Sequence, residues 1–131
     1  MVEQRILDAF QTMWGPFPEP VMLIHKSRTI LAVNQLGENL GITAGIKCHS
    51  LNPEVNPGED HCSRCNANLA LKTGETVCTE DETAGHRIIG YWMPLKEAVD
   101  VYVHFGIGTA EMIKSAAAAR VAAPPSDLVT L

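Results

Sequence analysis

The first segment of the chain carries apolar residues at helical spacing. Within residues 2–14 they recur every three or four positions and fall on one stripe of a helix, at Ile6, Phe10, Met13 and Trp14. Three prolines at alternate positions in residues 16–20 then end the helix, because a proline ring cannot continue it. The pattern predicts an amphipathic helix followed by a proline-rich connection.

Two short strand-like runs follow, at residues 21–25 and 29–33. The polar segment between them, residues 26–28, is short enough for a hairpin, although it lacks a glycine. Residues 34–40 have the character of a short helix that ends at Gly41. Between Gly45 and Asp60 the turn dipeptides predict a loop.

The second half of the chain predicts one helix, three strands and a final helix. The first helix spans residues 63–72, with Ser63 as its cap and Gly74 as its stop. The strands are expected at residues 75–82, 86–95 and 100–108. In the last of them Val101, Val103 and Phe105 alternate with polar or aromatic neighbours, so they share one face. An alanine-rich helix over residues 109–120 and a loose tail complete the pattern.

This order of elements predicts an α+β fold: a five-stranded, mostly antiparallel sheet with helices on one face, preceded by the N-terminal amphipathic helix. We divide the chain into three parts. Residues 1–18 form the helix and its proline-rich connection, residues 19–115 the domain, and residues 116–131 the end of the alanine-rich helix and the tail. We find no internal repeat.

Composition and charge narrow the function classes. The chain has 131 residues, of which 46% are hydrophobic and 19% charged, as expected for one globular domain. A net charge of -5 argues against direct nucleic-acid binding. No apolar run reaches the roughly 18 residues of a membrane span, and the charged first ten residues are unlike a secretory signal. We therefore expect a cytoplasmic protein, in which cysteines favour metal or redox chemistry over structural disulfides.

Several motifs together resemble the PAS domain family. In that family two strands are followed by an Asn that starts the first helix and by a later Gly, which match Asn34 and Gly41. Thr73-Gly74-Glu75 resembles the junction that opens the third strand, and residues 107–111 resemble the last strand running into a signalling helix. The resemblance covers roughly residues 5–115.

The resemblance implies a non-catalytic sensor. Such a domain binds a small ligand or a metal, or senses redox state, and couples the signal to dimerisation, an effector domain or a histidine kinase in signal transduction or transcription regulation. It also implies a homodimer through the N-terminal helix. From the residues alone, the apolar stripe of that helix could instead cap the sheet of its own chain.

One PAS subset, found in bacterial sensor kinases and regulators, has a cysteine shortly after a glycine and then a Cys-x-x-Cys pair before the long helix. Here Cys48 follows Gly45, and Cys62-Ser63-Arg64-Cys65 forms the pair. Two thiolates at the turn entering a helix can converge on one metal, with Cys48 as third ligand. The fourth ligand could be Cys78, or an imidazole of His49 or His61.

The cysteine chemistry has three interpretations. Thiolate-rich sites select zinc or an iron–sulfur cluster; reversible disulfides would make a redox switch; and the thiols could simply pack as small apolar side chains. Haem-binding PAS domains usually take their axial ligand from a His in the long helix, and residues 63–72 contain no His, so the resemblance disfavours haem. It also disfavours flavin, because residues 63–67 lack the motif of the light-sensing flavin subset. No catalytic motif is present, so we expect no enzyme. Alternative functions are an interaction module with a structural zinc and a thiol-disulfide redox protein.

Overall fold

The structure is a computed structural model, and it describes residues 2–51 and 64–122 of the chain. The first half contains α1 (Gln4–Trp14), β1 (Val21–His25), β2 (Ile30–Val33), α2 (Gln35–Asn39) and the 3-10 turn η1 (Cys48–Leu51). The second half contains α3 (Ala67–Thr73), β3 (Val77–Thr83), β4 (His86–Pro94), β5 (Val101–Ile107) and α4 (Thr109–Ala122). The predicted helices and strands are therefore present, with ends shifted by a few residues.

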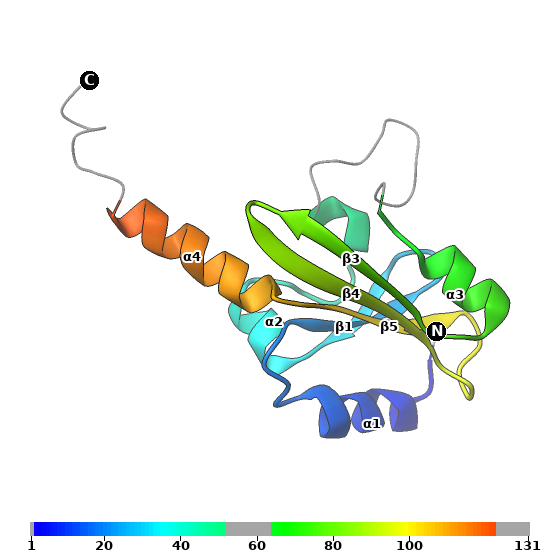
Figure 1. The fold of residues 1–131 in the computed structure, drawn as a ribbon. Helices are drawn as coiled ribbons and strands as arrows, with labels where there is room; N and C mark the ends of the chain where they lie inside the picture. Colours follow the sequence, from blue (N-terminus) through cyan, green and yellow to red (C-terminus); the bar gives the residue numbers. More distant parts are fainter. Residues whose placement is uncertain (1, 52–63, 123–131) are drawn as a thin grey trace.

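The five strands form one antiparallel sheet in the order β2-β1-β5-β4-β3. The N-terminal hairpin and the C-terminal strands meet at the β1–β5 pairing, where Leu23 lies opposite Val103. α1 lies on one side of this sheet and α3 on the other, and α4 extends away from both (Figure 1). The predicted α+β architecture is confirmed.

The two faces of the sheet are named here after the helices that cover them. On the α1 face, Phe10 packs with alternate residues of the central strands, including Leu23, Val103 and Phe105. On the α3 face, the buried cluster consists of Ile24, Ile30, Ala67, Ala70, Trp92 and Tyr102. Successive residues of a strand point to opposite faces, which explains why neighbours in β5 belong to different clusters.

α1 covers the sheet of its own chain. Phe10 is 4% exposed, and Ile6 and Trp14 pack against the same cluster, whereas Met13 is 72% exposed. The sequence left open whether this stripe caps the sheet or pairs with a second copy. Capping accounts for most of the stripe, and dimerisation through this helix remains a prediction.

Two details depart from the predicted boundaries. The helix expected at residues 63–72 is described from Ala67, with Asn66 at its N-cap position, and Ser63 lies outside the described residues. The loop expected from Gly45 contains η1, a four-residue turn that is too short to leave a helical period in the sequence. No helix in the described part of the chain is long and apolar enough to cross a membrane.

Asn34 fixes the connection between α1 and β1. Its side chain is fully buried, and its Oδ1 accepts hydrogen bonds from the backbone N–H groups of Val21 (2.9 Å) and Gly37 (3.1 Å). Its Nδ2 donates to carbonyl oxygens of the connection, those of Trp14, Phe17 and Glu19. The asparagine expected to start a helix therefore also holds the proline-rich connection against the sheet.

Candidate functional site

Two of the four predicted site cysteines lie on the α3 face. Cys48 begins η1, and its backbone N–H donates to the carbonyl oxygen of Arg28 at 2.7 Å. Cys65 precedes the first residue of α3 by two positions. Both are partly buried and pack against the buried cluster of that face. The fold thus places two cysteines that are 17 positions apart in the sequence on the same face of the sheet.

Cys78 lies on the opposite face. It pairs with Tyr91 across β3 and β4, and the Tyr91 ring stacks on Phe105 of the α1 face at a centroid distance of 5.0 Å. Its side chain is exposed, so it does not point into the core. The sheet therefore stands between Cys78 and the pair formed by Cys48 and Cys65. Cys62 and His61 lie outside the described residues.

Among the described residues, no group of three or more His, Cys, Asp or Glu side chains could hold a metal ion. The thiols of Cys48 and Cys65 are the donors that pack against the α3-face cluster in the described residues. Within the described segments, the Nδ1 atom of His49 is buried without a hydrogen-bond partner. Of the alternatives for the fourth ligand that the structure describes, His49 adjoins Cys48 in η1, while Cys78 lies across the sheet.

The described donors therefore do not complete a four-ligand site, and the metal centre remains a prediction. Zinc in structural sites takes four ligands, whereas among residues 2–51 and 64–122 the α3 face offers two thiols, those of Cys48 and Cys65. A disulfide switch that uses these two thiols also remains a prediction.

Aromatic side chains fill the α3 face beneath the helix. Tyr102 is fully buried, and Trp92 is 5% exposed with its ring stacked on His104 at 4.7 Å. The Nδ1 atom of His104 lies 2.8 Å from the carbonyl oxygen of Tyr91. Burial lowers the pKa of His104 below its ordinary value, and this hydrogen bond acts in the opposite direction. Trp92 belongs to the buried core of this face.

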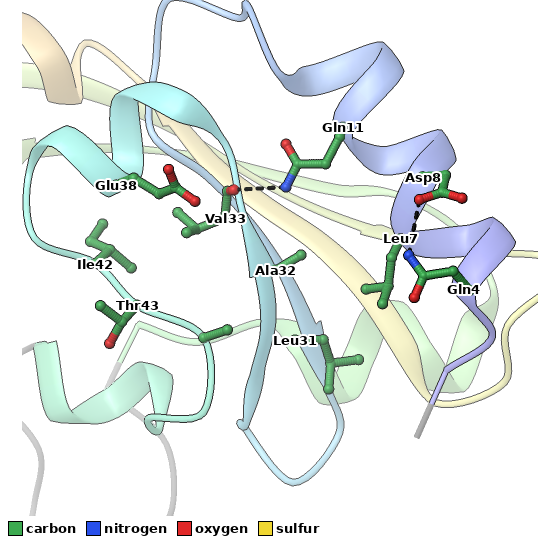
Figure 2. A pocket seen from close by; sticks show the side chains of 11 residues that line it. Gln4, Leu7, Asp8, Gln11, Leu31, Ala32, Val33, Glu38, Ile42 and Thr43 are labelled. Carbon is green, nitrogen blue, oxygen red and sulfur yellow. Dashed lines mark hydrogen bonds between the residues drawn. The ribbon is translucent and has the colours of Figure 1, made fainter.

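A groove lies elsewhere, beside β2, which is an edge strand of the sheet. It has a volume of about 450 Å³ and runs between α1 and the segment after α2 (Figure 2). Leu31 and Ala32 contribute to its floor, and Gln11 of α1 closes over it by donating to the carbonyl oxygen of Val33 at 3.0 Å. A smaller hollow of about 220 Å³ lies between α1 and the ends of β4 and β5. No cysteine lines either cavity.

A second functional feature joins the connection after α1 to α4. Glu19 is 9% exposed, and its carboxylate accepts hydrogen bonds from the backbone N–H groups of Gly108 (2.7 Å) and Ala110 (2.8 Å). A carboxylate at a helix N-terminus satisfies donors that the helix itself leaves unpaired. Gly108 has φ +105°, and a Cβ there would lie 2.6 Å from the carbonyl oxygen of Arg87, so only glycine fits.

Local sequence patterns do not indicate this link. Glu19 precedes its partners by 89 and 91 positions, and neither helical nor strand periodicity relates residues that far apart. The nearby prolines predicted a rigid connection but not what its acidic residue would contact. A search for unpaired acidic residues facing predicted helix starts could have raised the possibility.

No family model and no curated protein matches this sequence. Solved structures do match. A sensory box sensor histidine kinase from Vibrio cholerae superposes with a TM-score of 0.56 at 12% identity, covering 83% of this chain and 98% of that one. The chain has a PAS-like fold.

Two further structures are similar at a TM-score of 0.49. One is a domain of an HTR-like protein from Haloarcula marismortui, at 21% identity over 68% of this chain and 95% of that one. The other is the photoactive yellow protein domain of the sensor histidine kinase Ppr from Rhodospirillum centenum, at 16% identity over 80% of this chain and 98% of that one.

Proposed function

We propose that this chain is a non-catalytic PAS-type sensor domain in which thiol chemistry at Cys48 and Cys65 is the input and the position of α4 is the output. The observation that carries the proposal is the shared position of the two cysteines on the α3 face. They pack against a cluster that contains Tyr102 of β5, and β5 leads directly into α4. The similar fold in a sensor histidine kinase supports a signalling role.

The path from input to output is short. A change at the thiols, by metal binding or disulfide formation, alters the packing around Tyr102. β5 transmits that change through Gly108 to α4, whose first turn is held by Glu19. The input thus selects between two arrangements of α4. A histidine kinase or another effector, together with dimerisation, would then respond to the arrangement of α4.

The first experiment measures what the thiols hold. The full chain, purified without oxygen, is assayed for zinc and iron, visible absorbance and the number of reactive thiols. The double variant Cys48→Ser, Cys65→Ser is compared with Cys78→Ser, which alters a thiol on the other face. We expect bound metal, or oxidisable thiols, to be lost in the double variant and retained in the control. Metal-free protein with inert thiols would overturn the proposed input.

The second experiment measures the output. Hydrogen exchange of the α4 amides is followed before and after chelation, or before and after oxidation if no metal is bound. A sensor keeps its sheet protected while exchange in α4 changes. A module with a structural zinc instead unfolds as a whole on chelation, which contradicts the proposal. Turnover of a dithiol substrate would contradict it in favour of a redox enzyme.

A further inference from the structure

Arg28 is a buried cation at an unusual backbone position. It follows Ser27 in the β1–β2 hairpin with φ +71°, a region that glycine adopts more readily than any other residue. Its side chain is only 3% exposed, although arginine is almost never fully buried unless it is paired. Two unfavourable features at one residue indicate that the guanidinium itself has a use at this position.

The hydrogen bonds of Arg28 are incomplete. Its Nη1 donates to the carbonyl oxygen of Lys26 at 2.5 Å, and its Nη2 donates to Oδ1 of Asn68 in α3 at 2.9 Å. Its Nε is buried without a partner within the described segments, where no carboxylate forms an ion pair with it either. A buried charge without an opposite charge is strongly unfavourable, so a negative ligand would be strongly favoured here.

The open donor lies on the edge of the guanidinium that suits a carboxylate. Nε and Nη2 share one edge, and their N–H groups form the fork that binds two carboxylate oxygens at once. Asn68 supplies one neutral oxygen to that edge, which satisfies Nη2 and leaves Nε unpaired. Because Asn68 is exposed on α3, the edge lies next to the molecular surface.

The surrounding charge favours an anion as well. Lys26 and Lys47 flank the hairpin: Lys26 pairs with Asp100 at 3.2 Å, while the Nζ of Lys47 binds the carbonyl oxygen of Ser27 and has no carboxylate partner among the described residues. Together with Arg28, the two lysines make three cations, whereas the carboxylate that pairs with them in the described residues is that of Asp100. The whole chain, by contrast, has a net charge of -5. This end of the sheet is therefore a local positive region in an acidic protein.

We propose that Arg28 binds a small carboxylate ligand at its Nε–Nη2 edge, with Asn68 at the mouth of the site. The ligand would replace Asn68 on Nη2 and satisfy Nε, which turns an incompletely paired cation into a bidentate ion pair. The backbone carbonyl of Arg28 accepts from the N–H of Cys48, so occupancy would also be felt at the cysteine segment. The proposed carboxylate binding does not depend on the proposed thiol chemistry and can be tested without it.

The test uses acetate as the probe. Thermal unfolding is measured in sodium acetate and in sodium chloride at equal ionic strength, since salt alone screens charges. We expect acetate to raise the melting temperature by about 3–6 °C at saturation. The Nε–H resonance of Arg28 should move with acetate along a saturable curve.

Two variants separate ligand binding from a purely structural role. Arg28→Gly relieves the positive φ and should lose the acetate-specific shift. Asn68→Asp, at an exposed position, places a carboxylate of the protein itself on Nη2. It should raise the melting temperature in chloride and abolish the response to acetate. Equal melting in both salts for the unaltered chain, or an acetate shift that survives in Asn68→Asp, would overturn the proposal.

Discussion

The two faces of the sheet are built on different principles. On the α1 face, the rings of Trp14, Phe17 and Tyr91 surround Phe105 at centroid distances of 5.0–5.3 Å. On the α3 face, Cys48 and Cys65 pack against the apolar cluster, and the buried guanidinium of Arg28 donates a hydrogen bond to Asn68 of α3. Aromatic packing makes the first face a source of stability, while the second holds groups that can react or bind.

The proposed thiol input on the α3 face and the proposed output at α4 are both connected to β5. β5 contributes Phe105 to the α1 face and Tyr102 to the α3 face, and it ends at the start of α4. Under the proposed function, the closely packed α1 face would support β5, so that a change on the α3 face would pass along the strand to α4. The following experiments test whether the two faces really differ in this way.

The largest effect is expected from Phe105→Ala. Phe105 is 6% exposed at the centre of the aromatic group, so its removal leaves a large cavity. Truncation of a buried Phe costs about 3–5 kcal/mol of unfolding free energy. Denaturant unfolding measures the loss. The control Leu69→Ala removes a side chain on α3 that is 50% exposed and should change stability by less than about 1 kcal/mol. Similar losses in both variants would contradict the proposed role of the α1 face.

A smaller effect is expected from Glu19→Gln. The amide can accept with only one oxygen, so one of the bonds from Gly108 and Ala110 is lost and the interaction with the helix N-terminus weakens. We expect a loss of about 1–2 kcal/mol and faster hydrogen exchange at both amides. Glu38→Gln, at an exposed position on α2, is the matched control and should leave α4 unaffected. Unchanged exchange in Glu19→Gln would show that the carboxylate does not hold α4.

His104 should make stability depend on pH. Burial lowers the pKa of His104 in the folded chain, whereas an unfolded chain takes up this proton near pH 6.5. Below that pH the unfolded state binds more protons, so the free energy of unfolding falls as the pH falls from about 7 towards the folded pKa. The slope from one proton is at most about 1.4 kcal/mol per pH unit.

The variant His104→Phe keeps a ring against Trp92 but cannot titrate. Its free energy of unfolding is measured by denaturant at several pH values. The contribution of His104 to the pH dependence of this free energy should be absent. The hydrogen bond to the carbonyl oxygen of Tyr91 is also lost, which lowers stability by an amount that is the same at every pH. An unchanged slope in the variant would assign the pH dependence to other groups.

Local sequence patterns predicted much of the fold. β1 coincides with the predicted strand at residues 21–25, and the alternation around Val103 correctly assigned the two faces of β5. These features depend on neighbours in the sequence, and strand periodicity reports them directly. The role of Asn34 was predicted as a helix start, but its bonds to the proline-rich connection come from tertiary structure.

The site was less predictable because its geometry depends on register and on distant contacts. Cys78 could be assigned to a face only once its pairing with Tyr91 was known, since a shift of one residue reverses every side chain of a strand. Arg28 was part of a polar hairpin segment, and nothing in that segment indicates a positive φ or a partner in α3. Cys48 and Cys65 lie on one face of the sheet, and their joint role remains a prediction.

The smallest effect concerns Cys78, which among the described cysteines lies on the α1 face. A hydrogen bond between the side chains of Tyr91 and Cys78 raises the pKa of the Tyr91 phenol above its ordinary value. The variant Cys78→Ala should therefore shift the phenolate absorbance titration of Tyr91 to lower pH. The double variant Cys48→Ser, Cys65→Ser alters thiols across the sheet and should leave this titration unchanged. A shift in the double variant would mean that the sheet does not insulate the two faces, and that thiol chemistry on the α3 face reaches the aromatic group through β5.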